Sequence, residues 1–137
     1  SSGATCIAAL RKGQTLTIAN VGDSRCVLGT RDTSKYKKNF EAVQLSSDHK
    51  PDRPDELFRI RNEGGHVECR HVLVNRSNGT VRMPVGPPRV WYNLTGETVG
   101  LAMSRSLGDI VAHKVGVSSI PEIDVYDIDQ SKDEFLI

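Results

Sequence analysis

The chain has 137 residues, and its 18 lysines and arginines almost balance its 17 aspartates and glutamates. A formal net charge of +1 argues against a nucleic-acid binder or a protein of anionic membrane surfaces, because both need a clear basic excess. No apolar run approaches the roughly 18 residues of a membrane span, so we expect a globular domain without one.

Alternation of apolar and polar residues predicts β-structure in the first third of the chain. Residues 15–19 and 25–28 are predicted to be strands, and the turn-forming residues between them predict a hairpin over residues 15–28. The polar residues 30–41 predict an exposed loop, and residues 42–45 predict a third short strand.

A helix is predicted to follow these strands. Asp52 is suited to the N-cap, and the acidic side chains of Asp55 and Glu56 favour the first helical turn. Gly64 and its neighbouring glycine are suited to end the helix, because glycine accepts a left-handed conformation. The helix is expected to bury three apolar side chains: Leu57, Phe58 and Ile60.

The second half of the chain begins with a segment of low regularity. Residues 68–99 contain three prolines, an Asn-Gly pair and Trp91, which predicts an irregular functional loop with one hairpin. A second helix is predicted over residues 101–113, and strands over residues 122–128 and from residue 134 onward. The second helix is expected to bury four apolar side chains: Leu101, Met103, Leu107 and Ile110.

The cysteines bear on the cellular location of the protein, and the chain ends bear on whether the sequence is part of a longer polypeptide. Cys6, Cys26 and Cys69 are too few and too scattered for a disulfide scaffold or a zinc cluster. Their odd number favours a reducing compartment, so we expect an intracellular protein, in the cytoplasm or nucleus. The chain lacks a starting Met and stops within an apolar run, so we interpret it as a piece of a longer polypeptide.

Several families of catalytic motif are absent from the sequence. It has no glycine-rich nucleotide loop, no G-x-S-x-G elbow, and no cysteine followed by arginine at the C-x5-R spacing. Carboxylates remain: Asp23, Asp48 and Asp109 all lie beside a glycine or serine at predicted element ends. Such carboxylates either coordinate Mg2+ or Mn2+, which prefer oxygen ligands, or cap their own turns.

Four ordered segments resemble the type 2C protein phosphatases, a family of metal-dependent serine/threonine phosphatases. The first two are Ser-Gly-Ala-Thr-Cys at residues 2–6 and Ala-Asn-Val-Gly-Asp-Ser-Arg at residues 19–25. The third joins Asp-His-Lys-Pro at residues 48–51 to Glu-Gly-Gly-His-Val at residues 63–67, and the fourth is Gly-Leu-Ala-Met-Ser-Arg-Ser-Leu-Gly-Asp at residues 100–109.

The resemblance implies an α+β fold, a sandwich of two antiparallel β-sheets flanked by α-helices, of which this chain holds an incomplete part. Residues 1–137 would form the central portion of one catalytic domain. The implied activity is hydrolysis of phosphoserine and phosphothreonine in phosphorylated protein substrates. The implied cofactor is a pair of Mn2+ or Mg2+ ions whose bridging water attacks phosphorus.

The resemblance assigns one metal ligand to this chain. The family's main ligands lie in Asp-Gly and Asp-Asn pairs, and neither pair occurs here. We therefore expect no catalytic residue in the chain and little activity from it alone. Asp23 matches the family aspartate that holds a third, weaker metal, although a turn-capping role remains the alternative. Loss of the metal ligands from the whole protein would instead give a pseudophosphatase acting as a binding or regulatory module.

Residues 68–99 take the place of the flap beside the family's active site, which influences substrate choice. Four flap arginines would meet an acidic or phosphorylated peptide, or would simply be solvated: Arg70, Arg76, Arg82 and Arg89. Other motif residues are expected to be architectural. We expect Ser104 to pack within the second helix, where Arg105 and Asp109, four residues apart, would form an ion pair.

Overall fold

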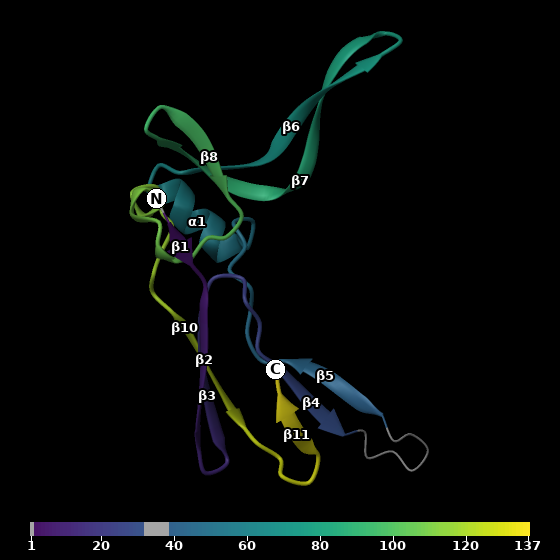
Figure 1. Cartoon of the computed structure of the whole chain (residues 1–137), viewed down its shortest axis with the longest axis vertical. Coiled ribbons are helices and arrows are strands. Elements are labelled where there is room, and N and C mark those ends of the chain that lie inside the picture. Colours follow the sequence, from purple (N-terminus) through teal and green to yellow (C-terminus); the bar gives the residue numbers. More distant parts are fainter. Residues whose placement is uncertain (1, 32–38) are drawn as a thin grey trace.

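The computed structural model of the chain describes residues 2–31 and 39–137. Antiparallel strands dominate it (Figure 1), and the helices in this part of the chain are α1 (Pro54–Asn62) and α2 (Ile110–His113). Most of the loop predicted at residues 30–41 lies outside the described residues. Neither described helix is long and apolar enough to cross a membrane.

The first sheet joins three strands in the order β10-β3-β2. These are β2 (Cys6–Lys12), β3 (Thr15–Val21) and β10 (Glu122–Asp127), all antiparallel to their neighbours. The strands predicted over residues 15–19 and 122–128 are therefore confirmed, whereas β2 was not predicted. Its exposed positions carry alanines as well as charged residues, so the sequence shows no clear alternation.

The second sheet has the order β11-β4-β5 and combines β4 (Val27–Arg31), β5 (Phe40–Gln44) and β11 (Asp133–Leu136). The short strands predicted near residues 42–45 and 134–137 are confirmed. The hairpin predicted over residues 15–28 is wrong, because β3 pairs with β2 and β10 while β4 pairs with β5 and β11. The turn after β3 thus carries the chain from one sheet to the other.

These two sheets share a small apolar core. Leu16, Ile18 and Cys26 are buried in it, with Leu45 and Tyr126 packed against them. The opposite face of the first sheet stays open among the described residues, and three of its apolar side chains are exposed: Leu10, Ile123 and Val125. The structure therefore has the layered form of a sandwich that is covered on one side only.

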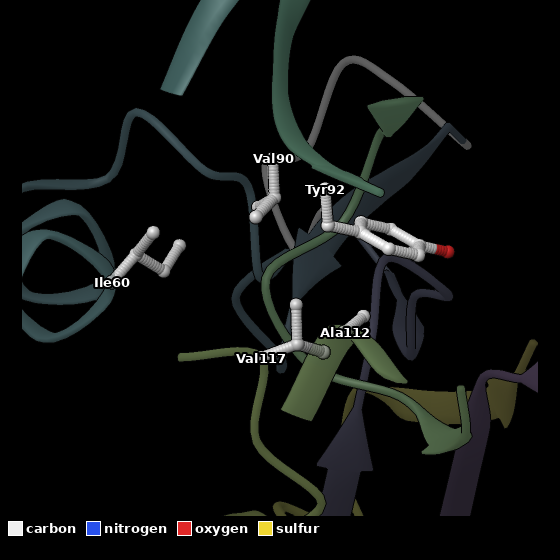
Figure 2. Close-up of a cluster of buried hydrophobic side chains, with 5 residues drawn as sticks. All are labelled: Ile60, Val90, Tyr92, Ala112 and Val117. Atoms are coloured by element: carbon white, nitrogen blue, oxygen red, sulfur yellow. The ribbon is translucent and has the colours of Figure 1, made fainter. Parts of the chain in front are cut away.

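The helix α1 packs into a second apolar core. Figure 2 shows its five buried members, which converge from α1, β7, α2 and the segment after α2: Ile60, Val90, Tyr92, Ala112 and Val117. Ile60 confirms part of the predicted buried face, but Phe58 is 69% exposed. The N-cap is Arg53 and not Asp52, because the helix begins one residue later, at Pro54.

The segment predicted to be irregular is instead a three-stranded antiparallel sheet. It consists of β6 (His66–Arg76), β7 (Gly79–Leu94) and β8 (Glu97–Leu101), in the order β6-β7-β8. Since β8 pairs only with residues 90–94 of β7, the prolines of β7 lie on an edge that requires no N–H donor. The far end of the β6–β7 ribbon projects away from α1 and the other sheets (Figure 1).

The helix predicted over residues 101–113 is wrong except for its last turn. The short strand β9 (Leu107–Gly108) pairs with β1 (Gly3–Ala4), and α2 begins only after Asp109. Gly108 has a φ of 82° and Asp109 a φ of 43°, so both residues are left-handed and interrupt a helix. Leu107 and Ile110, which were expected to be buried, are exposed.

Candidate functional site

The turn after β3 positions Asp23. Its glycine, Gly22, has a φ of 109°, and a Cβ atom there would lie 2.4 Å from a Thr5 methyl group, so only glycine fits. The Gly22 N–H donates to Nδ1 of His49, and its carbonyl accepts from the His49 N–H, both at 3.0 Å. Asp23 thus leaves a fixed backbone at the end of the first sheet.

Two cations accompany the carboxylates at this turn. Lys50 Nζ lies 2.5 Å from Oδ2 of Asp23 and 3.9 Å from Oδ2 of Asp48. Arg25 donates to both oxygens of Asp48, at 2.7 and 3.1 Å. These hydrogen bonds hold the pKa of Asp48 below its usual range, although partial burial opposes them. Asp23 and Asp48 therefore belong to a charge-balanced group.

This group does not make a metal centre by itself. Within residues 2–31 and 39–137, no three His, Cys, Asp or Glu side chains converge in a way that would hold a metal ion. Asp48 is occupied by Arg25, and Asp109 is buried beside Gly3, where a Cβ would lie 1.9 Å from its carboxylate. Of the three aspartates considered as metal ligands or turn caps, the structure thus brings Asp23 and Asp48 near one another, and both are paired with cations.

The buried His49 connects the loop before α1 to the turn after β3 and to the first residue of β10. His49 is fully buried, and its Nε2 lies 3.0 Å from the Glu122 carboxylate, which Arg53 also contacts at 2.8 Å. With Gly22 donating to Nδ1, the Nε2 atom carries the proton and donates to Glu122. Burial and the positive charge of Arg105 lower the pKa of His49, so the ring is neutral at pH 7.

The densest charged cluster surrounds Glu56 in the first turn of α1, and we call it the Glu56 cluster. Its fully buried carboxylate accepts hydrogen bonds from Arg59 at 2.7 and 2.6 Å, from Ser104 at 2.5 Å and from Arg105 at 2.7 Å. Burial raises the pKa of Glu56, but these three donors outweigh it and hold the pKa far below its usual range.

The Glu56 cluster was missed by the sequence analysis. Arg105 was expected to pair with Asp109 on one helix, but it reaches across to α1 because no helix joins those two residues. Ser104 is buried as expected, yet it donates to Glu56 from an extended segment. The one available signal was the spacing of Glu56 and Arg59, three residues apart on a predicted helix.

The sheet β6-β7-β8 carries the four arginines proposed to meet substrate. Arg89 donates to the Gly100 carbonyl at 2.9 Å, whereas Arg70, Arg76 and Arg82 are exposed along the projecting ribbon. At the base of this ribbon is a cavity of about 390 Å³, lined by Arg70 and Arg82 together with His66, Glu68, His71 and Trp91. Arg70 and Arg82 thus line a concave surface, whereas Arg76 and Arg89 do not.

Comparisons with known proteins agree with the sequence motifs. A family model described as "Protein phosphatase 2C" matches residues 1–137. The chain is 44% identical over 123 residues to "Probable protein phosphatase 2C 12" of Oryza sativa subsp. japonica, covering 89% of this chain and 28% of that protein. It is 40% identical over 137 residues to "Probable protein phosphatase 2C 72" of Arabidopsis thaliana, covering 99% and 36% respectively.

Solved structures show the same fold. A serine-threonine phosphatase 2C from Toxoplasma gondii superposes with a TM-score of 0.70 at 23% identity, over 95% of this chain and 39% of that chain. A C. elegans sex determining protein superposes with a TM-score of 0.62 at 24% identity, over 96% and 25%. The predicted α+β fold, incomplete in this chain, is confirmed. The chain spans about a quarter to a third of the curated relatives described above.

Proposed function

Because the chain belongs to the protein phosphatase 2C family, we propose that the whole protein hydrolyses phosphoserine and phosphothreonine in proteins with a metal-activated water. The observation that supports this most is the match of the family along all of residues 1–137. We also propose that the metal is Mn2+ or Mg2+, hard cations that prefer carboxylate oxygens. The free thiols of the three cysteines fit our proposal of an intracellular location.

The described residues do not fit the two-metal centre, so its principal carboxylates would come from other parts of the whole protein. We propose that Asp23 adds a ligand to a third, weaker metal. Its side chain is 26% exposed at the end of a sheet, on a turn fixed by Gly22 and His49. Lys50 donates to this carboxylate, and a cation at Asp23 would have to displace it.

Two substitutions separate a metal ligand from a turn cap. In the whole protein, Asp23→Asn keeps an oxygen for the turn but removes the charge that a hard cation prefers. We expect it to shift the metal titration of turnover to higher concentration and to leave the melting temperature unchanged. If Asp23 only caps the turn, Asn will be tolerated and Asp23→Ala will cost about 1 kcal/mol of stability.

A substitution of Lys50 should change the metal concentration needed for turnover in the opposite direction. Lys50→Gln removes the positive charge that lies 2.5 Å from Oδ2 of Asp23. Since a nearby cation opposes metal binding, we expect this variant to need less metal than the wild type for half-maximal turnover. A metal titration that responds to neither Lys50→Gln nor Asp23→Asn would remove Asp23 from the proposed site.

We propose that residues 68–99 form the flap beside the active site and that its arginines favour negatively charged substrates. The sheet β6-β7-β8 supports this, because it presents Arg70, Arg76 and Arg82 to solvent.

The proposed phosphatase activity is assayed as release of phosphate from a phosphothreonine peptide by the whole protein, with Mn2+ or Mg2+ and then with EDTA. We expect turnover only with metal; turnover that survives EDTA would contradict the proposal, and no turnover would favour a pseudophosphatase. We expect the 137-residue chain alone to be inactive.

A further inference from the structure

The outer part of the flap carries positive charge without compensating carboxylates. Residues 69–96 include four arginines and no Asp or Glu, although the whole chain has a net charge of only +1. Across residues 2–31 and 39–137, none of these arginines is in an ion pair. Glu68, which precedes the segment, is held by His66 at 3.2 Å and His71 at 3.6 Å.

The register of the ribbon separates these arginines onto two faces. Residues 70–76 of β6 pair without a break with residues 79–85 of β7, and directly opposed residues share a face. We name one side the Arg70 face; its side chains are Arg70, Val72, Val74, Arg76, Val81, Met83 and Val85. Arg76 lies 3.5 Å from the Met83 sulfur, in agreement with this assignment. Arg82 is on the opposite side, 3.3 Å from His71.

The Arg70 face is apolar in the middle and basic at both ends. Val81 and Val85 are 45% and 48% exposed, and the ribbon projects away from α1 and the other sheets (Figure 1). A two-stranded ribbon gains little stability from an apolar face that water contacts. The arrangement is therefore suited to a partner that covers the valines and neutralises Arg70 and Arg76.

We propose that the Arg70 face docks an extended acidic segment of the protein substrate, apart from the phosphorylated residue; this inference rests on the proposed function. Arg70 and Arg76 are six residues apart on one strand, about 20 Å at 3.3 Å per residue. A single phosphate group does not reach both of them. An extended segment does, if its carboxylates are about six residues apart and apolar side chains alternate between them.

The test measures binding without requiring turnover. The probe is a fluorescent, unphosphorylated peptide with two glutamates six residues apart and valines at the alternating positions between them. Its control has lysines in place of the glutamates. By fluorescence anisotropy, we expect the whole protein to bind the glutamate peptide at least about fivefold more tightly than the lysine peptide.

Substitutions locate the binding to one face. The double variant Arg70→Gln with Arg76→Gln should lose about fivefold in affinity for the glutamate peptide. The control double variant Lys12→Gln with Arg61→Gln also removes two exposed positive charges, but from β2 and α1 outside the flap, and should change affinity by less than about twofold. Equal losses in all of these variants would indicate non-specific attraction and would overturn the proposal.

A second readout distinguishes this inference from the proposed function. The whole protein is assayed with p-nitrophenyl phosphate, which is too small to reach both arginines. Metal-dependent turnover combined with equal binding of the two peptides would overturn docking and leave the phosphatase proposal standing. Selective binding that depends on Arg70 and Arg76, without any turnover, would support docking and contradict the phosphatase proposal.

Discussion

Arginines in the Glu56 cluster and arginines on the flap differ in their partners. Arg59 and Arg105 both donate to one fully buried carboxylate, which ties α1 to the segment around residue 104. Arg70 and Arg76 extend from a projecting ribbon and have no carboxylate within ion-pair distance among the described residues. Arginine side chains therefore contribute to folding in the Glu56 cluster and remain available for recognition on the flap.

The largest effect is expected from breaking the Glu56 cluster. Glu56→Ala leaves Arg59 and Arg105 partly buried without their counter-charge, so we expect a loss of about 3 kcal/mol in the free energy of unfolding. Urea unfolding of the whole protein measures this loss. Glu63→Ala, at the exposed end of the same helix, should change stability by less than about 0.5 kcal/mol. Similar values for the two variants would contradict the structural role of the cluster.

The pH dependence of stability is expected to follow His49. Its pKa in the folded protein is lowered by burial and by Arg105 and Arg53, against the opposing effect of Glu122 and Glu56. The unfolded chain therefore takes up the proton first as the pH falls through about 6.5, and stability decreases below that pH.

Two substitutions test whether His49 causes this pH dependence. His49→Gln should flatten the curve of unfolding free energy between about pH 7.5 and 5.5, because the buried titrating ring is gone. Asn78→Ala, at the exposed turn between β6 and β7, removes no titrating group and should retain the slope of the wild type. A slope that persists unchanged in His49→Gln would contradict the assignment.

The smallest effect on folding is expected from the flap. Because Arg70 and Arg76 make no ion pair in the described structure, Arg70→Gln and Arg76→Gln should each change the free energy of unfolding by less than about 0.5 kcal/mol. Thermal and urea unfolding check this value. A loss comparable to that of Glu56→Ala would mean that the flap arginines stabilise the fold.

Local patterns in the sequence predicted the helix α1 and the strands β3, β10 and β11, because each depends on its own alternation or helical spacing. Partners distant in sequence determined the rest. Apolar residues at helical spacing suggested a helix after Leu101, but Gly108 and Asp109 interrupt it, and the Asp109 N–H donates to the carbonyl of Ser2. Prolines suggested an irregular flap, but the part of β7 that holds them has a neighbouring strand, β6, on one side only, which leaves its other edge free of ladder hydrogen bonds.

In the candidate site, too, local features were predictable and contacts between distant segments were not. The turn holding Asp23 was predicted from its glycine and neighbouring polar residues, and the structure has a turn there. The partners Lys50 and Glu56 were not predicted as site residues, since their contacts join segments 27 and 49 residues apart. Only the folded chain brings those segments together.

A salt titration tests most directly whether the partly buried Arg59 and Arg105 hold the fold while the Arg70 face binds a partner. Raising KCl from about 0.1 to 1 M shortens the Debye length from about 10 to 3 Å, which screens exposed charges far more than buried ones. We predict that the affinity of the whole protein for the glutamate peptide falls at least about fivefold, while the free energy of unfolding changes by less than about 1 kcal/mol. Peptide affinity that is independent of salt, or stability that falls in parallel with it, would contradict the account.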